Sequence, residues 1–402
     1  MLKWIEIDLS AIAANLESVR EQLSFNVNSP PFPPPCLAGR QVPVGRDRGR
    51  GVKLMGVVKA DAYGHGAVPV SRLLEKRGVD CLGVLTVEES SSLRRSKIRS
   101  PLILLAPPLP EEVPELLRWR LIPTVDSGKL LQTLDQALKN HNAFSTPSPI
   151  KLDLDFGLGR WGISPKELPR FLREIKKYPR LKLVGLSTHL DYMPGRNAVE
   201  AEEKLRAFDK ISKEVKKQFP EVLCHAANSS ILLDFPHRQM DMVRAGNLLY
   251  GINLSSKKIP LKNSWQFYAR LISIKKFSKG KSVGYGSEYV APRAMTLGTL
   301  PVGYADGLTM EPADKLISLH SSFQYWGTFK GKPAPFISRC GISHVLVDLS
   351  KVSSIKVGDA VCLPVRRTAA SSKICRVYKG EGVGGGAPAG TVSVEEMTST
   401  FS

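Results

Sequence analysis

The chain has 402 residues, of which 42% are hydrophobic and 23% are charged. This composition is typical of a soluble globular protein with two or three domains and a large core. No run of about 18 apolar residues occurs, which argues against a membrane-spanning helix, and the N-terminus lacks the apolar stretch of a signal peptide.

The formal net charge is +20. Such an excess of Lys and Arg suits nucleic acids, anionic surfaces or small anionic ligands. The positive residues are spread along the chain, and the local clusters at 40–50, 213–217 and 275–281 are not interleaved with aromatic residues. We therefore expect a solvated basic surface and no specific nucleic-acid partner.

The six cysteines stand apart, and no Cys-x-x-Cys pair occurs. This spacing argues against zinc and thioredoxin-type sites, so no metal is expected. Cys81 and Cys224 lie in strand-like runs that are typical of buried free thiols. A reducing cytoplasm is therefore the expected location.

The N-terminal region begins with a short strand at 4–7 and a helix over about 11–23, for which Asp8 or Ser10 can serve as the cap. Residues 26–51 carry a proline cluster followed by arginines among glycines. This composition predicts an exposed basic insertion without regular structure, and a proline-rich ligand for another protein is the alternative.

Strand-like and helix-like segments alternate from residue 53 to residue 244. The expected strands cover 53–59, 80–86, 101–106, 121–125, 149–154, 181–188, 222–226 and 240–244. The expected helices cover 66–77, 88–95, 111–119, 127–139, 165–178, 198–218 and 229–234. This α/β pattern predicts a (β/α)8 barrel of the TIM type rather than a doubly wound open sheet, which usually has fewer strands.

From about residue 248 the pattern changes to short alternating strands, at 266–275, 294–303, 325–330, 334–339, 344–348 and 360–364. This predicts a mostly β C-terminal domain. The expected parts are a barrel at 8–245 with the insertion at 26–51, a β-domain at 246–379 that includes the N-terminal strand 1–7, and a flexible Gly-rich tail at 380–402.

The most informative segment is VVKADAYGHG, residues 57–66. Lys59 follows a buried apolar strand, where loss of water lowers the pKa of a lysine and makes its neutral amine available as a nucleophile or base. An isolated lysine at such a place more often extends its amine to solvent. Lys59 alone therefore does not establish a reactive amine, and the residues around it in segment 57–66 must support that interpretation.

Barrel enzymes hold their chemistry at the carboxyl ends of the strands. This rule selects polar or glycine residues after five strands: Lys59 and Tyr63, Arg160, His189, Asn228 and Ser229, and Arg244, Gly246 and Asn247. Hydroxyls and backbone amides near Ser229 and Gly246 suit a phosphate. Each residue alone also fits a structural role, and their joint occurrence indicates an active site.

These segments resemble those of alanine racemases, the fold-type III enzymes that depend on pyridoxal phosphate (PLP). The resemblance continues at SVGYGSEY, residues 282–289, and at PVGYADG, residues 301–307, and covers most of residues 1–365. It implies an amino-acid substrate and a head-to-tail homodimer. In such a dimer the β-domain of one subunit completes the active site of the other.

The resemblance also implies a role for each site residue. Lys59 would hold PLP covalently and act as base on one face of the α-carbon, and the partner's Tyr285 would act on the other face. His189 would bond that tyrosine, and Arg244 would face the pyridine nitrogen. The remaining roles are to hold the phosphate, by Tyr63, Asn228, Ser229, Gly246, Asn247 and Tyr304, and to orient the substrate carboxylate, by Arg160 and Ile342.

Some positions depart from the family pattern. Where the family often has a lysine modified to a carbamate, this chain has Asp153, whose carboxylate we expect to brace Arg160 directly. The family's Met-Asp pair becomes Ile342-Ser343, and the sequence from 366 onward is unlike the family. The expected function is a PLP-dependent amino-acid racemase acting on alanine, with serine or a broader range of amino acids as the alternative.

Three other interpretations stay open. Non-catalytic PLP-binding proteins resemble the barrel alone and lack a β-domain with a catalytic tyrosine. PLP decarboxylases of basic amino acids share both domains, but their reaction benefits from a protonated pyridine, which Arg244 would oppose. A polyanion-binding protein is supported by the net charge alone.

Overall fold

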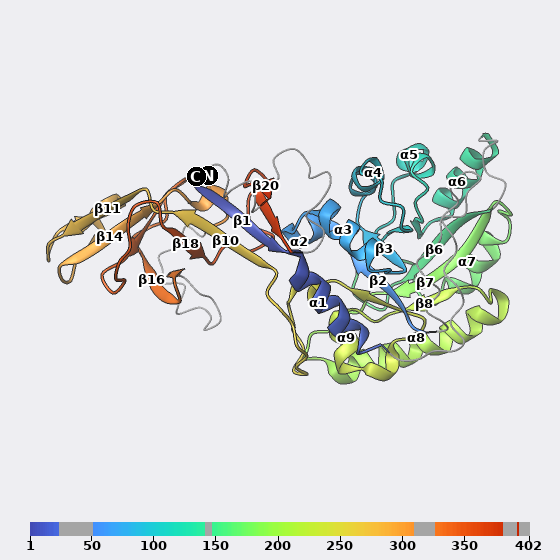
Figure 1. Ribbon diagram of the computed structural model, residues 1–402. Helices are drawn as coiled ribbons and strands as arrows, with labels where there is room; N and C mark the ends of the chain where they lie inside the picture. The colour runs from blue at the N-terminus through green and yellow to red at the C-terminus, as the bar shows by residue number, and fades with distance from the viewer. Residues whose placement is uncertain (24–50, 141–146, 309–325, 381–391, 394–402) are drawn as a thin grey trace. The chain divides into compact units, whose positions relative to one another are not determined.

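The structure is a computed structural model that describes residues 1–23, 51–140, 147–308, 326–380 and 392–393 (Figure 1). It contains two compact units, one formed by residues 11–262 and the other by residues 1–10 together with 263–402. Residues 26–50 of the insertion expected at 26–51 and most of the tail expected at 380–402 lie outside the described residues.

Eight parallel strands form the centre of the first unit: β2 (Lys53–Val57), β3 (Cys81–Val84), β4 (Leu102–Leu104), β5 (Thr124–Val125), β6 (Ser148–Leu154), β7 (Leu181–Thr188), β8 (Leu223–His225) and β9 (Met242–Ala245). They pair in the orders β4-β3-β2-β9 and β5-β6-β7-β8. Parallel bridges from Ile103 to Ile122 and from Asn228 to Arg244 join the two groups at both seams. The predicted (β/α)8 barrel is therefore confirmed.

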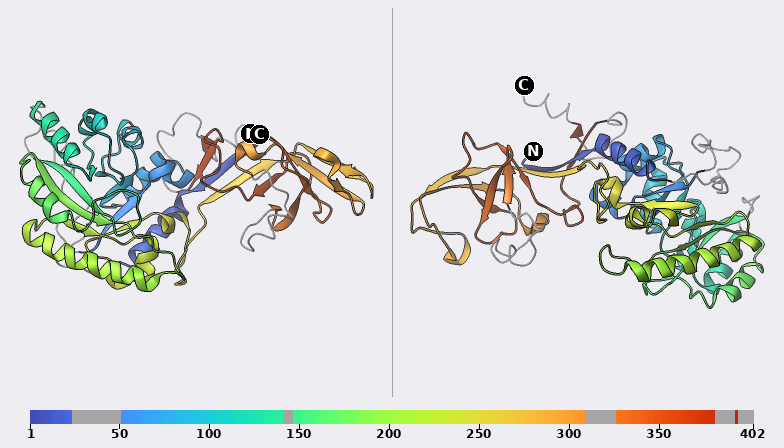
Figure 2. Two further views of the ribbon diagram at one scale, coloured as in Figure 1. Left: turned by 180° about the vertical axis from the view of Figure 1, so that it is seen from behind. Right: turned by 90° about the horizontal axis from the view of Figure 1, so that it is seen from below.

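The helices of this unit lie outside the strands (Figure 2). They are α1 (Leu9–Arg20), α2 (Lys59–Gly64), α3 (Ala67–Lys76), α4 (Val87–Arg95), α5 (Val113–Arg118), α6 (Gly128–Asn140), α7 (Leu168–Ile175), α8 (Ala198–Gln218) and α9 (Ser229–Asp234), with 3-10 turns η1 (Pro110–Glu112), η2 (Pro236–Arg238) and η3 (Asn247–Tyr250). Their inner faces carry the apolar residues, as in α7, where Leu168, Phe171, Leu172 and Ile175 are buried. No helix in the described ranges is long and apolar enough to cross a membrane.

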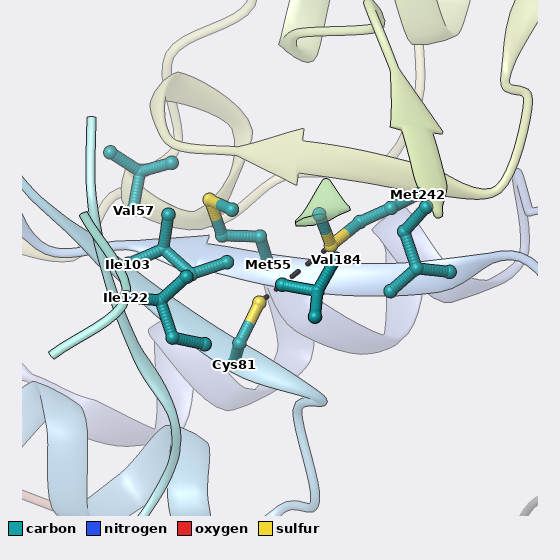
Figure 3. Close-up of a cluster of buried hydrophobic side chains, with 8 residues drawn as sticks. Met55, Val57, Cys81, Ile103, Ile122, Val184 and Met242 are labelled. Carbon is teal, nitrogen blue, oxygen red and sulfur yellow. Dashed lines mark hydrogen bonds between the residues drawn. The ribbon is translucent and has the colours of Figure 1, made fainter. Parts of the chain in front are cut away.

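The interior of the barrel is filled by apolar side chains from separate strands (Figure 3). Met55, Cys81 and Met242 are buried there, and the Cys81 thiol lies 3.6 Å from the Met242 sulfur. A TIM-type barrel is a packed core rather than a pore, so it has no internal channel for a ligand. A binding site must therefore lie at the ends of the strands.

The second unit is a β-domain. Its strands are β1 (Lys3–Asp8), β10 (Trp265–Arg270), β11 (Ser273–Phe277), β12 (Ser282–Val283), β13 (Tyr289–Val290), β14 (Met295–Leu300), β15 (Trp326–Phe329), β16 (Lys332–Ile337), β17 (Val345–Asp348), β18 (Ala360–Leu363), β19 (Arg376–Lys379) and β20 (Val392–Ser393). Ten of them form one sheet, in the order β11-β14-β17-β16-β15-β18-β10-β1-β19-β20. Strand β1 runs antiparallel to β10 and parallel to β19, so the N-terminal strand is part of the large sheet of this unit.

The two units divide between Lys262 and Asn263, whereas the sequence placed the boundary between 245 and 246. The segment between these positions is packed on the barrel. Tyr250 is fully buried, and its hydroxyl donates a hydrogen bond of 2.8 Å to the backbone oxygen of Val57. Asn15 of α1 ties the same segment down, because its amide donates to the oxygens of Leu249 and Lys262 at 3.1 and 2.9 Å.

Replacing Asn15 tests this attachment. The Asn15→Ala change leaves the buried carbonyl of Leu249, the part-buried carbonyl of Lys262 and the Lys262 N–H, which donates to the Asn15 side-chain oxygen, without their partners. We expect the free energy of unfolding to fall by about 2–4 kcal/mol, measured by urea unfolding. Glu17→Ala, on the same helix with a side chain 47% exposed, is the control and should change it by less than about 1 kcal/mol. Equal losses in both variants would contradict the assignment.

Candidate active site

A cavity of about 310 Å³ lies at the carboxyl ends of the barrel strands. This volume is at the lower end of the range for small-molecule sites. The nine barrel residues selected from the sequence all line it: Lys59, Tyr63, Arg160, His189, Asn228, Ser229, Arg244, Gly246 and Asn247. The residues selected at the strand ends lie up to 188 positions apart in the chain, and the barrel fold brings them into one cavity.

Lys59 opens an unusual left-handed turn. The four residues after it, 60–63, have φ between 52° and 56°, a region that side chains other than glycine seldom adopt. Such residues cost about 1–2 kcal/mol each. Glu89 offsets part of this cost, because its carboxylate accepts hydrogen bonds of 2.7 Å from the amides of Ala60 and Leu85. The turn places both Lys59 and Tyr63 in the lining of the cavity.

The Lys59 amine is easier to deprotonate than an ordinary lysine. Burial lowers its pKa most, and the positive charges of Arg160 and Arg244 lower it further, while Glu89 acts in the opposite direction. A lower pKa means that more of the amine is neutral near pH 7. A neutral amine is the form that attacks an aldehyde or takes a proton.

Arg244 is a buried cation held by protein atoms. One terminal nitrogen donates to Nδ1 and the backbone oxygen of His225 at 2.6 and 3.0 Å. The other donates to the oxygens of Thr188 and Ala226 at 2.8 and 2.9 Å and lies 3.4 Å from Nδ1 of His189. Within the described residues the Nε–H has no acceptor, so it is the donor left for a ligand in the cavity.

Two histidines beside Arg244 are kept neutral. Burial and the charge of Arg244 lower the pKa of His189 to about 3, and the same two causes hold the pKa of His225 well below its usual range. Since a guanidinium only donates, Nδ1 of His225 must accept, and its proton lies on Nε2. A neutral His189 at the cavity wall can exchange hydrogen bonds with a phenol.

A buried polar group lies on the barrel side of the cavity. Lys151 donates to Ser187 at 2.7 Å, Ser187 donates to Asp153, and the Lys151 amine lies 3.7 Å from the Asp153 carboxylate. Burial lowers the pKa of Lys151 to about 8, although Asp153 opposes that shift. No direct bond joins Asp153 and Arg160 in the described chain, where the Arg160 guanidinium instead stacks on the ring of Trp161 at 3.9 Å. Asp153 therefore acts on Arg160 through its charge.

The other end of the cavity offers hydroxyls and amides. Burial raises the pKa of Tyr63, so its phenol stays protonated, and a Cβ on Gly246 would lie only 2.7 Å from the phenol oxygen. A larger residue at that position would therefore force the Tyr63 phenol to shift. The Ser229 hydroxyl accepts weak bonds of 3.3 and 3.4 Å from the amides of Gly246 and Leu248. The Asn228 side chain caps α9, and Asn228 lines the cavity together with Ser229 and Ser230.

These groups fit PLP. Its aldehyde needs a neutral amine, which Lys59 provides, and its phosphate needs hydroxyl and amide donors, which Tyr63, Ser229 and the loop at Gly246 provide. Its pyridine nitrogen needs a partner, and the Nε–H of Arg244 is available. The donor set therefore suits the whole cofactor rather than the phosphate alone.

Three site residues expected from the sequence lie in the β-domain. The side chains of Tyr285 and Ile342 are 62% and 61% exposed, and Tyr304 is 37% exposed. The Tyr304 amide donates to the oxygen of Gly341 at 3.1 Å, and the Tyr285 ring lies 5.8 Å from the ring of His344. Tyr304 and Ile342 thus belong to adjoining segments of this unit, while the lining of the cavity comes from residues 57–254.

A (β/α)8 barrel with a strand-end lysine, followed by a β-domain, defines the barrel class of PLP-dependent enzymes. Residues 44–254 match the alanine racemase N-terminal domain, and residues 264–382 match the alanine racemase C-terminal domain. The chain belongs to the alanine racemase family.

Individual relatives agree along most of the chain. The chain is 30% identical to an alanine racemase of Halothermothrix orenii and to one of Nostoc, and each alignment covers 90% of this chain and 86% of the relative. Among solved structures, it is similar to alanine racemase from Clostridium difficile 630, with a TM-score of 0.80 and 25% identity over 95% of this chain and 97% of the other.

The cofactor assignment predicts selective labelling of Lys59. Protein incubated with PLP and treated with borohydride should carry the cofactor on the peptide that contains Lys59. Labelling should persist at pH values below the usual pKa of lysine, because the pKa of Lys59 is lowered and its amine is more often neutral. Peptide mass spectrometry measures this. Lys59→Ala should abolish the label, and Lys76→Ala, at an exposed lysine, should leave it unchanged. Stable labelling of a different lysine would refute the assignment.

Proposed function

We propose that the protein interconverts L- and D-alanine, with PLP bound at Lys59 and with Lys59 and Tyr285 as the two proton-transferring groups. The observation that carries the proposal is the buried Lys59 amine of lowered pKa, in a cavity that also offers phosphate donors and a guanidinium. Membership of the alanine racemase family supports alanine as the substrate.

Racemisation needs a proton donor and a proton acceptor on opposite faces of the α-carbon. A single base on one face tends to return the proton that it took, which restores the starting enantiomer. Bound PLP supplies an aldehyde that joins the substrate amine and a ring that draws electrons away from the α-carbon. Lys59 then takes or returns the proton on one face, and the Tyr285 phenol does so on the other.

The cations around the cavity favour this outcome over decarboxylation. Arg244 is buried and held by His225, Thr188 and Ala226, so its charge cannot move away from a bound ring. A fixed cation at the pyridine nitrogen disfavours protonation there, and decarboxylation benefits from that protonation. Arg160, with its guanidinium against Trp161, is placed to hold the carboxylate of the amino acid.

Tyr285 must come from the β-domain, and we propose that it comes from the partner subunit of a homodimer. Its side chain is 62% exposed, which leaves the phenol free to enter another chain's site. His189 is neutral and lines the barrel cavity, so its ring can bond the partner's Tyr285. Tyr304 and Ile342 would accompany it, toward the phosphate and the substrate carboxylate respectively.

A non-catalytic PLP carrier is the second candidate. It is disfavoured because residues 264–382 match the alanine racemase C-terminal domain and the chain has a tyrosine at position 285. Serine or a broader range of substrates remains the alternative on the substrate side, because Ile342-Ser343 replaces the expected pair. A cytoplasmic location is part of the proposal, supported by Cys81, Cys224, Cys340 and Cys362, which are free thiols in the part of the chain that the structure describes.

Mixing two inactive variants tests the shared site. Lys59→Ala removes the base in the barrel, and Tyr285→Phe removes the one in the β-domain. If each site uses one residue from each chain, a mixed dimer holds one intact site, and a random mixture should recover about one quarter of the wild-type activity. Recovery is measured after denaturation and refolding together. Proven exchange of subunits without recovery would show that each site is built within one chain.

A second experiment separates the two faces. In Tyr285→Phe the barrel cavity is unchanged, so PLP binding should survive. Racemisation should fall by on the order of 10²–10⁴, and Lys59 should still exchange the α-proton of D-alanine with solvent. Deuterium incorporation into each enantiomer from heavy water measures this. Equal loss of exchange from both enantiomers, with PLP and substrate still bound, would contradict the two-base proposal.

A further inference from the structure

Four side chains at the solvent edge of the barrel cavity have no part in the proposed chemistry: Tyr192, Met193, Pro194 and Leu254. Met193 is 49% exposed and Leu254 is 60% exposed, although both line the cavity, so they lie at its mouth. The first three belong to the loop between β7 and α8, and Leu254 belongs to the loop after η3. Two separate loops therefore form an apolar rim.

One carboxylate ties the two loops together. Asp234, at the end of α9, accepts a hydrogen bond of 2.8 Å from the Tyr192 hydroxyl on one oxygen. Its other oxygen accepts from the hydroxyl of Ser255, which is 4% exposed and directly follows Leu254. Burial and the bond to Asp234 raise the pKa of Tyr192 to about 12, so its phenol stays a donor.

The Tyr192 ring is fixed by further contacts. It packs edge-on against Phe235 with ring centroids 5.1 Å apart. Because the hydroxyl is bonded to Asp234, the carbon atoms of the ring are the part left to line the cavity. The rest of the loop is held as well, since Asn197 accepts from the Met193 amide at 2.9 Å and Lys204 bonds Asp191 at 2.9 Å. The rim is therefore a braced apolar wall.

We propose that Asp234 is a positioning residue that sets the width of the cavity mouth and so limits the size of the amino-acid side chain accepted. This inference rests on the proposed function, and it names the part of the chain that selects alanine over larger substrates. The polar end of the cavity recognises groups that all amino acids share. Discrimination by size must come from a fixed apolar wall, where one methylene is worth about 10–200-fold in kcat/KM.

Three variants test the proposal with alanine and with 2-aminobutyrate, which is one methylene longer. Asp234→Ala removes the hydrogen bonds to both loops. Tyr192→Phe removes only the bond to Tyr192 and keeps the aromatic ring, and Ser255→Ala removes only the bond to Ser255. The ratio of kcat/KM for 2-aminobutyrate to that for alanine should rise about tenfold in Asp234→Ala and about threefold in each of the other two variants. For alanine, KM should rise while kcat stays within about twofold, because the proton-transferring groups are untouched.

Glu214→Ala on α8, whose side chain is 62% exposed, is the matched control and should leave the ratio unchanged. If Asp234→Ala does not fold, Tyr192→Phe and Ser255→Ala, which each remove one hydrogen bond to Asp234, test the proposal instead. The preference between 2-aminobutyrate and alanine can also be measured from their dissociation constants, by titrating each amino acid and recording the absorbance of bound PLP. This measurement does not depend on turnover. An inactive wild type would refute the proposed function. The ratio of the dissociation constants for the two amino acids would still test whether Asp234 sets the width of the cavity mouth. Unchanged ratios in all variants, by both measurements, would overturn the role of Asp234.

Discussion

The site depends on an excess of positive charge in a half-enclosed cavity. The lining contains Lys59, Lys151, Arg160 and Arg244 but one carboxylate, Asp153, which gives a formal charge of +3 when all four cations are protonated. Buried charge without a counter-ion is costly. A phosphate of about two negative charges together with one substrate carboxylate would balance it. The unfavourable free energy of holding these like charges close together is thus offset when the anionic ligands bind.

Burial and the charge excess together explain the protonation states. Burial is the main cause that lowers the pKa of Lys59, Lys151, His189 and His225, and the neighbouring cations lower it further. Fixed backbone carbonyls hold Arg244, so the charge cannot escape by a change of rotamer. One electrostatic arrangement therefore prepares the amine, sets the histidine tautomers and provides affinity for anions.

Much of the fold was readable because the barrel strands are short apolar runs between turn signals. The eight strands and most of the helices agree with the expected ranges to within a few residues. The left-handed turn at 60–63 was not predictable, since it contains no glycine to announce a positive φ and depends on distant Glu89. Strand β19 was missed because its partner, β1, lies at the opposite end of the chain.

The sequence predicted the site residues that lie at the end of a barrel strand or in the loop after it. Lys151 and Ser187 were missed because they lie inside strands β6 and β7, although Lys151 shares a strand face with Asp153 two positions on. Their role follows from closure of the barrel, which brings the two strands together. Tyr192 was missed because its significance depends on Asp234 and Ser255, which are distant in the sequence.

The position of β1 has a consequence for biosynthesis. This strand is made before the barrel strands, and its antiparallel partner β10 begins at Trp265, after all of them. At ribosomal speeds of about 5–20 residues per second, β1 waits roughly 13–50 s for that partner. The barrel can close during this interval, while β1 remains a strand with unsatisfied edges. Translation thus completes the β-domain, which carries Tyr285, only after the barrel has been made.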